Sequence, residues 1–494
     1  MSRCARRGWQ TYRSMVKAPT VTRRAWLTRL AAPVLLGTGA AACAACGEPV
    51  SGPVQPQPTP ARRMSAYVVR LFTRAAAEDL QWRQALGAIA EDFGRAHDDM
   101  HLEIEHYEPR GTDGTTVAGY AAALSAGVAA GTVADLAHFT SSTWQVFAGR
   151  GSLQPLGDFA ARDRWTVPWP EGEAYELQTR FRGKRYLSPS SAGPMLMFYV
   201  QEHFQRAGVP YPRADWTYAD FQDTARRLTR RADGRDAYGV YGYEWNPGYV
   251  RNAVWWRMNG TTEWDRIAEP RKAAWATPAV IEAFQYQLYD SQYKLGVAPP
   301  RSLLEAGSGA TGIDGGGTAM KVEGPWFLQR MAERWRRHGT GPAGFDVQLL
   351  PTGKAGRKQH LNVLEGQVMT RNSKDRDAAW EVLKWIASEP GQRRIAESGR
   401  LCNVPDAVRA LWLPLAKHRY GIANGDAFAK AMEGSTFTLV GELDEDLVDR
   451  EAGLSQAIEG IASGSVSAKE AMTRVQPRVQ QTLDRYWAAQ QNAR

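Results

Sequence analysis

Hydrophobic and polar residues alternate along the body of the chain in the two periods that distinguish strands from helices. Residues 65–72 form a β-rich run, and residues 101–107 alternate like a half-buried strand. Residues 78–96 carry apolar side chains at helical spacing, and an Ala-rich helical stretch ends at Ala130, before a short apolar segment at 135–139. Strands that alternate with helices in this way predict an α/β fold with a mainly parallel sheet.

The carboxyl ends of parallel strands meet at one edge of a sheet, and ligands of such proteins gather there. The loops that begin at Phe72, Tyr107 and Phe139 are therefore expected to converge on a cleft.

The helical period returns later in the chain. Thr217 is typical of a helix cap, and the helix that follows, 218–230, places Phe221, Ala225 and Leu228 inward. Three further helices are expected over 377–388, 454–461 and 468–489. In the first of them, Ala379, Leu383 and Ile386 share one face.

Composition and charge narrow the class of protein. The 494 residues are 43% hydrophobic and 23% charged, which excludes a fibrous repeat, a disordered chain and a multispan membrane protein. The net charge of +9 would favour nucleic acid or an anionic membrane, yet the first 46 residues hold eight of the 61 basic side chains and no acidic one. The remainder is close to neutral, so we expect no nucleic-acid partner.

The basic first segment has the order of an export signal. Arg23 and Arg24 lie in Thr-Arg-Arg-Ala-Trp-Leu-Thr, which resembles the twin-arginine motif and precedes an apolar run at 30–42. The run ends in Ala-Ala-Ala-Cys-Ala-Ala-Cys-Gly, which looks like a bacterial lipobox. Cys46 fits that pattern better than Cys43 as the lipidated residue, and both stay candidates.

A tether is expected to follow the export signal. The residues from 48 to 60 include five prolines, which favour an extended spacer over a packed core. The first 46 residues therefore read as signal peptide and 47–64 as a tether that holds the body at the extracytoplasmic face of the cell membrane. Cys402 is the remaining cysteine of the body and is expected to be buried and structural.

Motifs for catalysis are scarce. The sequence has no Gly-x-Ser-x-Gly elbow, no His-Glu-x-x-His zinc helix and no Cys-x-x-Cys pair beyond the leader, so we expect no catalytic residue, no metal and no cofactor. Tryptophan is abundant instead, with 18 residues. A sugar presents an apolar face that stacks on flat aromatic rings, and four aromatics on predicted loops suit that role: Trp144, Trp245, Tyr249 and Trp326.

Several segments, in order, resemble the extracellular solute-binding proteins of ABC importers, within the large carbohydrate-binding family similar to maltose-binding protein. They are Phe198-Tyr-Val-Gln-Glu-His-Phe-Gln-Arg-Ala-Gly-Val-Pro-Tyr-Pro212, Thr318-Ala-Met-Lys-Val-Glu-Gly-Pro-Trp326, Phe345-Asp-Val-Gln-Leu-Leu-Pro-Thr-Gly353 and Ala379-Trp-Glu-Val-Leu-Lys-Trp-Ile386. The likeness spans about residues 66–487.

The resemblance implies an α/β, two-lobed periplasmic-binding-protein-like fold with a hinge and an inter-lobe ligand cleft. Lobe 1 is expected over 65–185 plus about 305–365, and lobe 2 over 186–304 plus about 366–494. The resemblance implies ligand contacts from three regions. They are the first-lobe loops (Phe72, Arg74, Arg110, Ser142, Trp144), the second-lobe aromatic loop with the stacking position (Glu244, Trp245, Tyr249, Trp326) and a return crossing (Glu365, Gly366).

The resemblance also implies the function and partners. We expect a monomeric, lipid-anchored and non-catalytic receptor that captures a mono- or oligosaccharide and delivers it to ABC permease subunits. Glu323 replaces the Asn often found before Gly-Pro-Trp, which leaves the identity of the sugar open. Two alternatives stay open: the same fold binding another solute, such as a glycerophosphate ester or a peptide, and an extracellular glycosidase.

Overall fold

The computed structural model describes residues 67–492 apart from 74–79, 108–115, 141–143, 167–172, 231–239, 247–248, 268, 306–310, 338–343, 357–359, 434–435 and 438–451. The chain divides into residues 1–63 and one compact unit, residues 64–494, to which every described element belongs.

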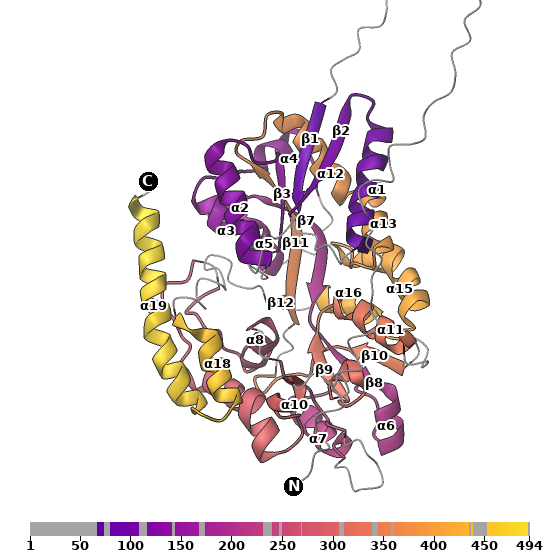
Figure 1. The fold of residues 1–494 in the computed structure, drawn as a ribbon, viewed down its shortest axis with the longest axis vertical. Helices are drawn as coiled ribbons and strands as arrows, with labels where there is room; N and C mark the ends of the chain where they lie inside the picture. The colour runs from indigo at the N-terminus through magenta and orange to yellow at the C-terminus, as the bar shows by residue number, and fades with distance from the viewer. Residues whose placement is uncertain are drawn as a thin grey trace, which may run out of the picture. The chain divides into compact units, whose positions relative to one another are not determined.

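The first lobe is built on a sheet whose centre is parallel (Figure 1). Strand β1 (Tyr67–Thr73) lies between β2 (Met100–His106) and β3 (Leu136–Thr140), and pairs in parallel with both. Helices α1 (Leu80–Ala96) and α2 (Thr116–Ala130) connect these strands. The β-α-β alternation read from the sequence is confirmed, because the apolar positions at each period are the ones that become buried.

The rest of that sheet is antiparallel. Strand β11 (His360–Thr370) runs against β3, and β4 (Leu153–Gln154) and β7 (Leu187–Pro194) run against β11, so the sheet is mixed rather than mainly parallel. Strand β12 (Thr436–Phe437) pairs with the start of β11. The short elements that complete this region are α3 (Trp144–Gly149), α4 (Gly157–Arg162), α5 (Glu173–Thr179), β5 (Arg180–Phe181) and β6 (Lys184–Arg185).

The second lobe is built on a separate, antiparallel sheet. Its central strand, β8 (Leu196–Val200), pairs with β9 (Met320–Glu323) on one side and β10 (Phe345–Gln348) on the other. Its helices include α6 (Gln201–Ala207), α7 (Tyr218–Leu228), α8 (Tyr249–Met258), α9 (Pro278–Gln285), the π-helix η1 (Tyr286–Lys294), α10 (Arg301–Glu305), the 3-10 turn η2 (Ile313–Gly315), α11 (Phe327–Arg337), α18 (Leu454–Ala462) and α19 (Ala468–Asn492).

Two long strands cross from one lobe to the other. Only Met195 separates β7 from β8, so one continuous extended segment enters both sheets. Strand β11 runs beside β7 along this crossing, and the register slips at a bulge between Glu365 and Gly366. In Figure 1 these strands pass between the two groups of helices. A bulge bends the strand that carries it and re-aims its side chains, here in the middle of the crossing.

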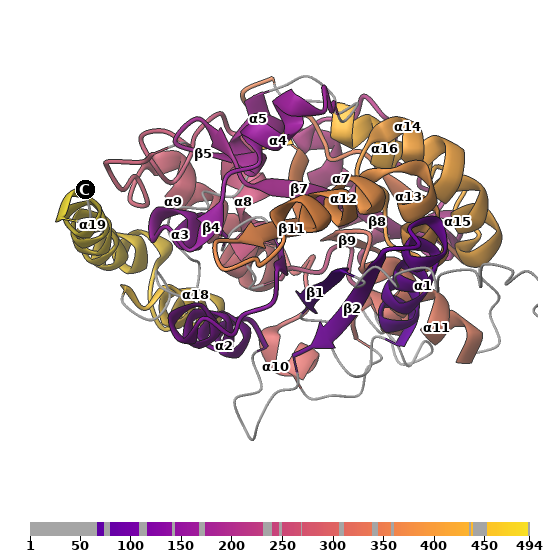
Figure 2. The same cartoon turned by 90° about the horizontal axis from the view of Figure 1, so that it is seen from above.

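The helices after β11 belong with the first lobe or lie beside the crossing. Helix α12 (Arg376–Ala387) packs on β1, β7 and β11 (Figure 2), and α13 (Glu389–Glu397) packs on α1. The following elements are α14 (Pro405–Ala407), the π-turn η4 (Val408–Trp412), α15 (Leu413–Tyr420) and α16 (Asp426–Glu433). Helix α16 contacts β7, β8 and β11, and α15 contacts α11.

Two segments have partners that differ from those expected from the predicted lobe limits, and the limits themselves stay a prediction. Residues 320–348 carry β9 and β10, which pair with β8 in the second lobe and not with the first-lobe sheet. Residues 376–397 carry α12 and α13, which pack on first-lobe elements. Hydrogen bonding to β8 and burial against α1 decide these placements, and neither is visible in local periodicity.

The helix cap and the buried helix faces expected from the sequence are confirmed. Thr217 accepts the Asp220 amide and the Asp220 carboxylate accepts the Thr217 amide, so a capping box starts α7. The inward residues of α7, and those of α12, are buried as predicted: Phe221, Ala225, Leu228, Ala379, Leu383 and Ile386.

Candidate ligand site at the crossing strands

A cavity of about 120 Å³ lies where the crossing strands meet the second lobe. Its walls come from β7 and β11, from the turn between β9 and α11, from the loop between α13 and α14, and from α15. The lining residues are Ser191, Ala192, Gly193, Pro325, Trp326, Gln329, Glu365, Ser398, Gly399, Arg400, Leu401 and Tyr420. An indole, a carboxylate, a guanidinium, an amide and hydroxyl groups therefore share one small volume.

Trp326 forms the aromatic wall. It follows β9 and is 43% exposed, although most tryptophans described in this chain are buried. Its Nε1–H donates to Glu323 Oε2 at 3.1 Å, and the guanidinium of Arg251 lies 5.7 Å from the centre of its ring. An exposed indole with a fixed plane is suited to stacking on a flat apolar face.

Glu365 forms the polar wall at the bulge of β11. The carboxylate accepts from Arg400 Nη1 at 2.5 Å and from the Ser191 hydroxyl at 3.3 Å, and His138 Nε2 lies 4.0 Å away. The Arg400 guanidinium also lies 4.4 Å from the centre of the Trp82 ring. An ion pair and a ring thus hold Arg400 at the cavity.

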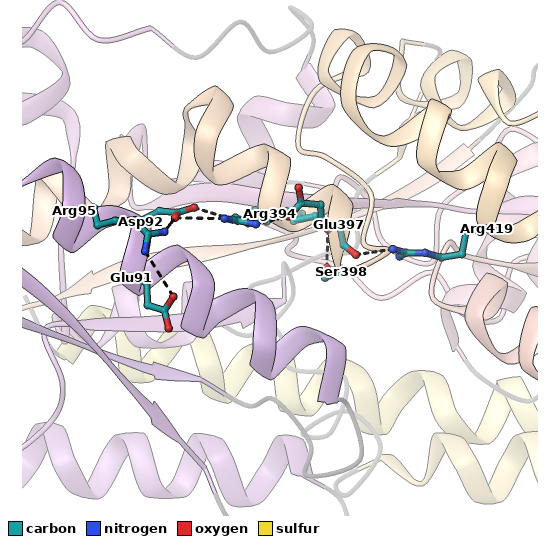
Figure 3. Close-up of polar contacts among 8 residues, drawn as sticks. Glu91, Asp92, Arg95, Arg394, Glu397, Ser398 and Arg419 are labelled. Carbon is teal, nitrogen blue, oxygen red and sulfur yellow. Dashed lines mark hydrogen bonds and ion pairs between the residues drawn. The ribbon is translucent and has the colours of Figure 1, made fainter.

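The loop that carries Arg400 is anchored at the end of α13. Arg394 donates from Nε to Asp92 of α1 at 2.7 Å and pairs with Glu397 at 2.8 Å, and Arg419 of α15 donates to the Glu397 carbonyl at 2.8 Å (Figure 3). The Arg394 hydrogen bond holds the pKa of Asp92 below its usual value. The anchor joins the first lobe to α15 beside the cavity.

The backbone of this loop at position 399 requires glycine. Its φ is +86°, and a Cβ atom there would lie 2.5 Å from the Tyr420 hydroxyl, which also lines the cavity. The Gly399 carbonyl accepts from Trp412 Nε1 at 3.2 Å. The loop backbone is therefore closely packed just before Arg400.

Two second-lobe residues expected at the ligand lie inside the protein. Glu244 is buried, pairs with Lys321 Nζ at 2.5 Å and accepts the Ile313 amide at 2.5 Å. Trp245 is buried and donates from Nε1 to the Pro299 carbonyl at 2.9 Å. Their side chains support the lobe from within and do not line the cavity.

The first-lobe residues expected to contact a ligand differ in burial. Phe72 is half-buried and stacks on Tyr120 with ring centres 4.8 Å apart. Trp144 is fully buried, packs in the core and does not line the cavity. The loop positions expected for Trp144 and Tyr249 are wrong, since these residues begin α3 and α8. Arg74, Arg110, Ser142 and the Tyr249 side chain lie outside the described residues, as do the leader positions Arg23, Arg24, Cys43 and Cys46.

Trp326 and Glu365 are the predicted residues that the cavity brings together. Gly366 does not line the cavity; it allows β11 to approach β7 closely, because a Cβ atom there would lie 2.3 Å from the Ser188 carbonyl oxygen. Sequence reasoning missed Arg400, since nothing in the local pattern marks a loop arginine as the partner of a carboxylate 35 residues away.

The described residues also bear on the predictions for Cys402 and for metal ligands. Cys402 is buried as predicted, and burial raises the pKa of its thiol to about 12. Among the described residues, no cluster of metal-ligating side chains occurs and no helix has the length and apolar character needed to cross a bilayer.

Two sheets joined by continuous crossing strands, with a polar cavity bordered by tryptophan at the crossing, define a two-lobed binding protein. Residues 84–393 match the family model described as bacterial extracellular solute-binding protein, and the chain belongs to this family.

The proteins that the chain resembles share little sequence with it. A binding protein of Brucella abortus is 23% identical over 340 residues, which is 68% of this chain and 77% of the relative. The sugar-binding protein MalE of Xanthomonas citri superposes with a TM-score of 0.69 at 18% identity, covering 86% of this chain and 99% of its own. An ABC substrate-binding protein of Listeria monocytogenes in complex with cycloalternan gives 0.66 at 17% identity, covering 85% and 99%. These structures support the two-lobed fold.

Proposed function

We propose that this chain is the substrate-binding lipoprotein of an ABC importer, which captures a mono- or oligosaccharide outside the cell and delivers it to permease subunits without chemical change. The observation that carries this proposal is the exposed indole of Trp326, which faces one cavity together with Glu365 and Arg400. A sugar offers an apolar face and a rim of hydroxyls, so a stacking ring beside charged hydrogen-bonding groups matches both parts.

The charge at the cavity favours a neutral ligand over a phosphate ester. Arg400 pairs with Glu365, and Arg251 beside Trp326 pairs with Glu323 at 2.8 Å. A phosphate would need guanidinium groups that are not already neutralised by carboxylates. Similar proteins support a sugar, since solved structures of the fold include complexes with mannobiose, mannotriose and D-tagatose.

The leader supports the location that we propose. A twin-arginine-like motif at Arg23 and Arg24, a lipobox with Cys46 or Cys43, and a Pro-rich spacer are what a receptor needs for export and tethering at the extracytoplasmic membrane face. A single lipid chain gives only marginal membrane binding, so a lipoprotein with several chains is the expected form. Mass spectrometry of the purified full-length protein would identify the modified cysteine.

A calorimetric screen of oligosaccharides tests the function. We expect at least one sugar to bind, and W326A to weaken that sugar by about 1 kcal/mol or more, the value of one aromatic stacking contact. Binding of glycerophosphate esters or peptides alone would favour the alternative solutes. Release of a new saccharide during incubation would establish a glycosidase and refute the receptor.

A further inference from the structure

The side chain of Trp326 is held from several directions. Its Nε1–H donates to Glu323 Oε2 at 3.1 Å, and Arg251 Nη2 donates to the same oxygen at 2.8 Å. The Arg251 guanidinium also lies over the indole ring. One buried carboxylate thus binds both the ring's donor and the cation above the ring.

The backbone of two glycines lies against the rest of the Trp326 ring. A Cβ atom on Gly324 would lie 2.4 Å from the indole Cη2, and one on Gly193 of the crossing strand β7 would lie 2.7 Å from Cζ3. The six-membered part of the indole therefore rests on two glycine backbones, one from its own turn and one from the crossing. A larger residue at either position would displace the ring.

The carboxylate that holds Trp326 is itself neutralised inside the lobe. The Glu323 side chain is 3% exposed, and Lys321 Nζ lies 3.6 Å from Glu323 Oε1 and 2.5 Å from Glu244 Oε1. Two carboxylates and two cations, Lys321 and Arg251, balance in this buried group. A buried carboxylate with this many partners keeps one orientation, because losing any partner leaves a charge uncompensated.

We infer that Glu323, with Arg251, is a positioning residue that fixes the indole of Trp326 as a preformed platform. Holding the ring in its bound orientation before the ligand arrives lowers the conformational entropy lost on binding. The consequence for sugar binding rests on the proposed function, whereas the fixed orientation of the ring does not.

The second lobe contains a matched control. Trp256 donates from Nε1 to Glu263 at 2.6 Å, and Arg257 pairs with Glu263 at 2.6 Å, so the same three residue types meet at one carboxylate inside the core. Trp256, Arg257 and Glu263 are fully buried and do not line the cavity. Substitution of Glu263 therefore reports the general cost of breaking such a group.

The first test needs no sugar. The full chain is labelled with 5-fluorotryptophan, and the Trp326 fluorine resonance is assigned by its loss in W326F. We expect E323M to shift and broaden that resonance, E323Q to shift it less because glutamine still accepts the indole N–H, and E263M to leave it in place. An unchanged Trp326 resonance in folded E323M would overturn the inference.

The second test uses maltotriose, mannotriose and cycloalternan as probes in calorimetry. For whichever binds most tightly, we expect E323M to raise Kd about tenfold, the lower end of the range for one hydrogen bond to a charged group, and E263M to change it less than about twofold. In a W326F background, which lacks the donor, E323Q should add less than about a twofold change. This background keeps the test decisive even where E323M does not fold.

Failure of the proposed sugar-binding function and failure of the positioning role of Glu323 give different results. If none of the probes binds the wild-type chain while the Trp326 resonance responds to E323M, the proposed ligand class is wrong and the positioning role stands. If a probe binds in a manner sensitive to W326A but Kd and the fluorine resonance ignore E323M, the positioning role is wrong and the receptor stands.

Discussion

Arg400 offers the sharpest test of the site, because its side chain meets the first lobe, the crossing and the cavity at once. Its guanidinium pairs with Glu365 at 2.5 Å and covers the Trp82 ring at 4.4 Å, and its side chain is 29% exposed. The variant R400M keeps most of the aliphatic stem and removes both polar contacts. Glu365, 19% exposed, is then left with Ser191 and His138 near its carboxylate.

The expected cost follows from these contacts. A charge-assisted hydrogen bond contributes about 1.5–3 kcal/mol, and a cation over an aromatic ring at a partly exposed site contributes about 0.5–1 kcal/mol. Since the pair is partly screened by water, we expect R400M to lower the free energy of unfolding by about 2 kcal/mol. We expect R400K to cost about half of that, because lysine keeps the charge without the planar fork.

Urea denaturation measures the stability and calorimetry with the tightest saccharide measures the affinity. R162M is the matched control, since Arg162 pairs with Asp163 and Asp377 at the surface, where water screens such pairs and they contribute little to stability. We expect R400M to weaken sugar binding about tenfold through a lost charged hydrogen bond, and R162M to leave it unchanged. R400M that unfolds like R162M would refute the energetic reasoning, and unaltered affinity would remove Arg400 from the site.

Three further predictions concern the scaffold around the cavity. Arg394 lowers the pKa of Asp92, so the contribution of Asp92 to stability is complete above pH 3.8 and is lost as the pH falls through the lower pKa of the folded state. The variant D92N should therefore reduce the loss of stability at acid pH, and an unchanged loss would contradict this assignment. G366A should unfold the crossing or prevent soluble expression, because its Cβ would lie 2.3 Å from the Ser188 carbonyl; a wild-type melting temperature would count against it. Cys402, with a thiol pKa raised to about 12, should resist a disulfide reagent at pH 8 until urea unfolds the chain, and rapid labelling of the folded protein would show that the loop opens.

Local patterns predicted the elements whose burial depends only on neighbours along the chain. The strands and helices between residues 67 and 140 and the capping box at Thr217 were readable because periodicity and capping are properties of a few consecutive residues. The strand pairing of residues 320–348 could not be predicted, since β9 and β10 hydrogen-bond to β8, more than 100 residues earlier.

At the candidate site, too, the local sequence does not predict which partners a single side chain contacts. Trp326 and Trp245 carry the same side chain and were both placed on loops, yet Trp326 faces the cavity while Trp245 donates to Pro299 in the core. An indole buries its ring wherever tertiary packing allows, so its orientation is set by partners that local sequence does not contain. Arg400 was missed for the same reason, since its partner Glu365 lies on a strand 35 residues earlier in the chain.

The position of these residues bears on how capture and lobe closure are linked. Trp326 belongs to the second lobe, whereas Glu365 lies on a crossing strand and Arg400 on a loop anchored to α1 of the first lobe through Arg394. A sugar that stacks on Trp326 and hydrogen-bonds to Arg400 gains both contacts only in the conformation that presents both. A ligand shifts a conformational equilibrium by its difference in affinity between the two states, so contacts of about 3 kcal/mol made in one state favour it by about 100-fold. A rigid Trp326 raises that difference, because a ring free to follow the ligand would stack equally well in the open state.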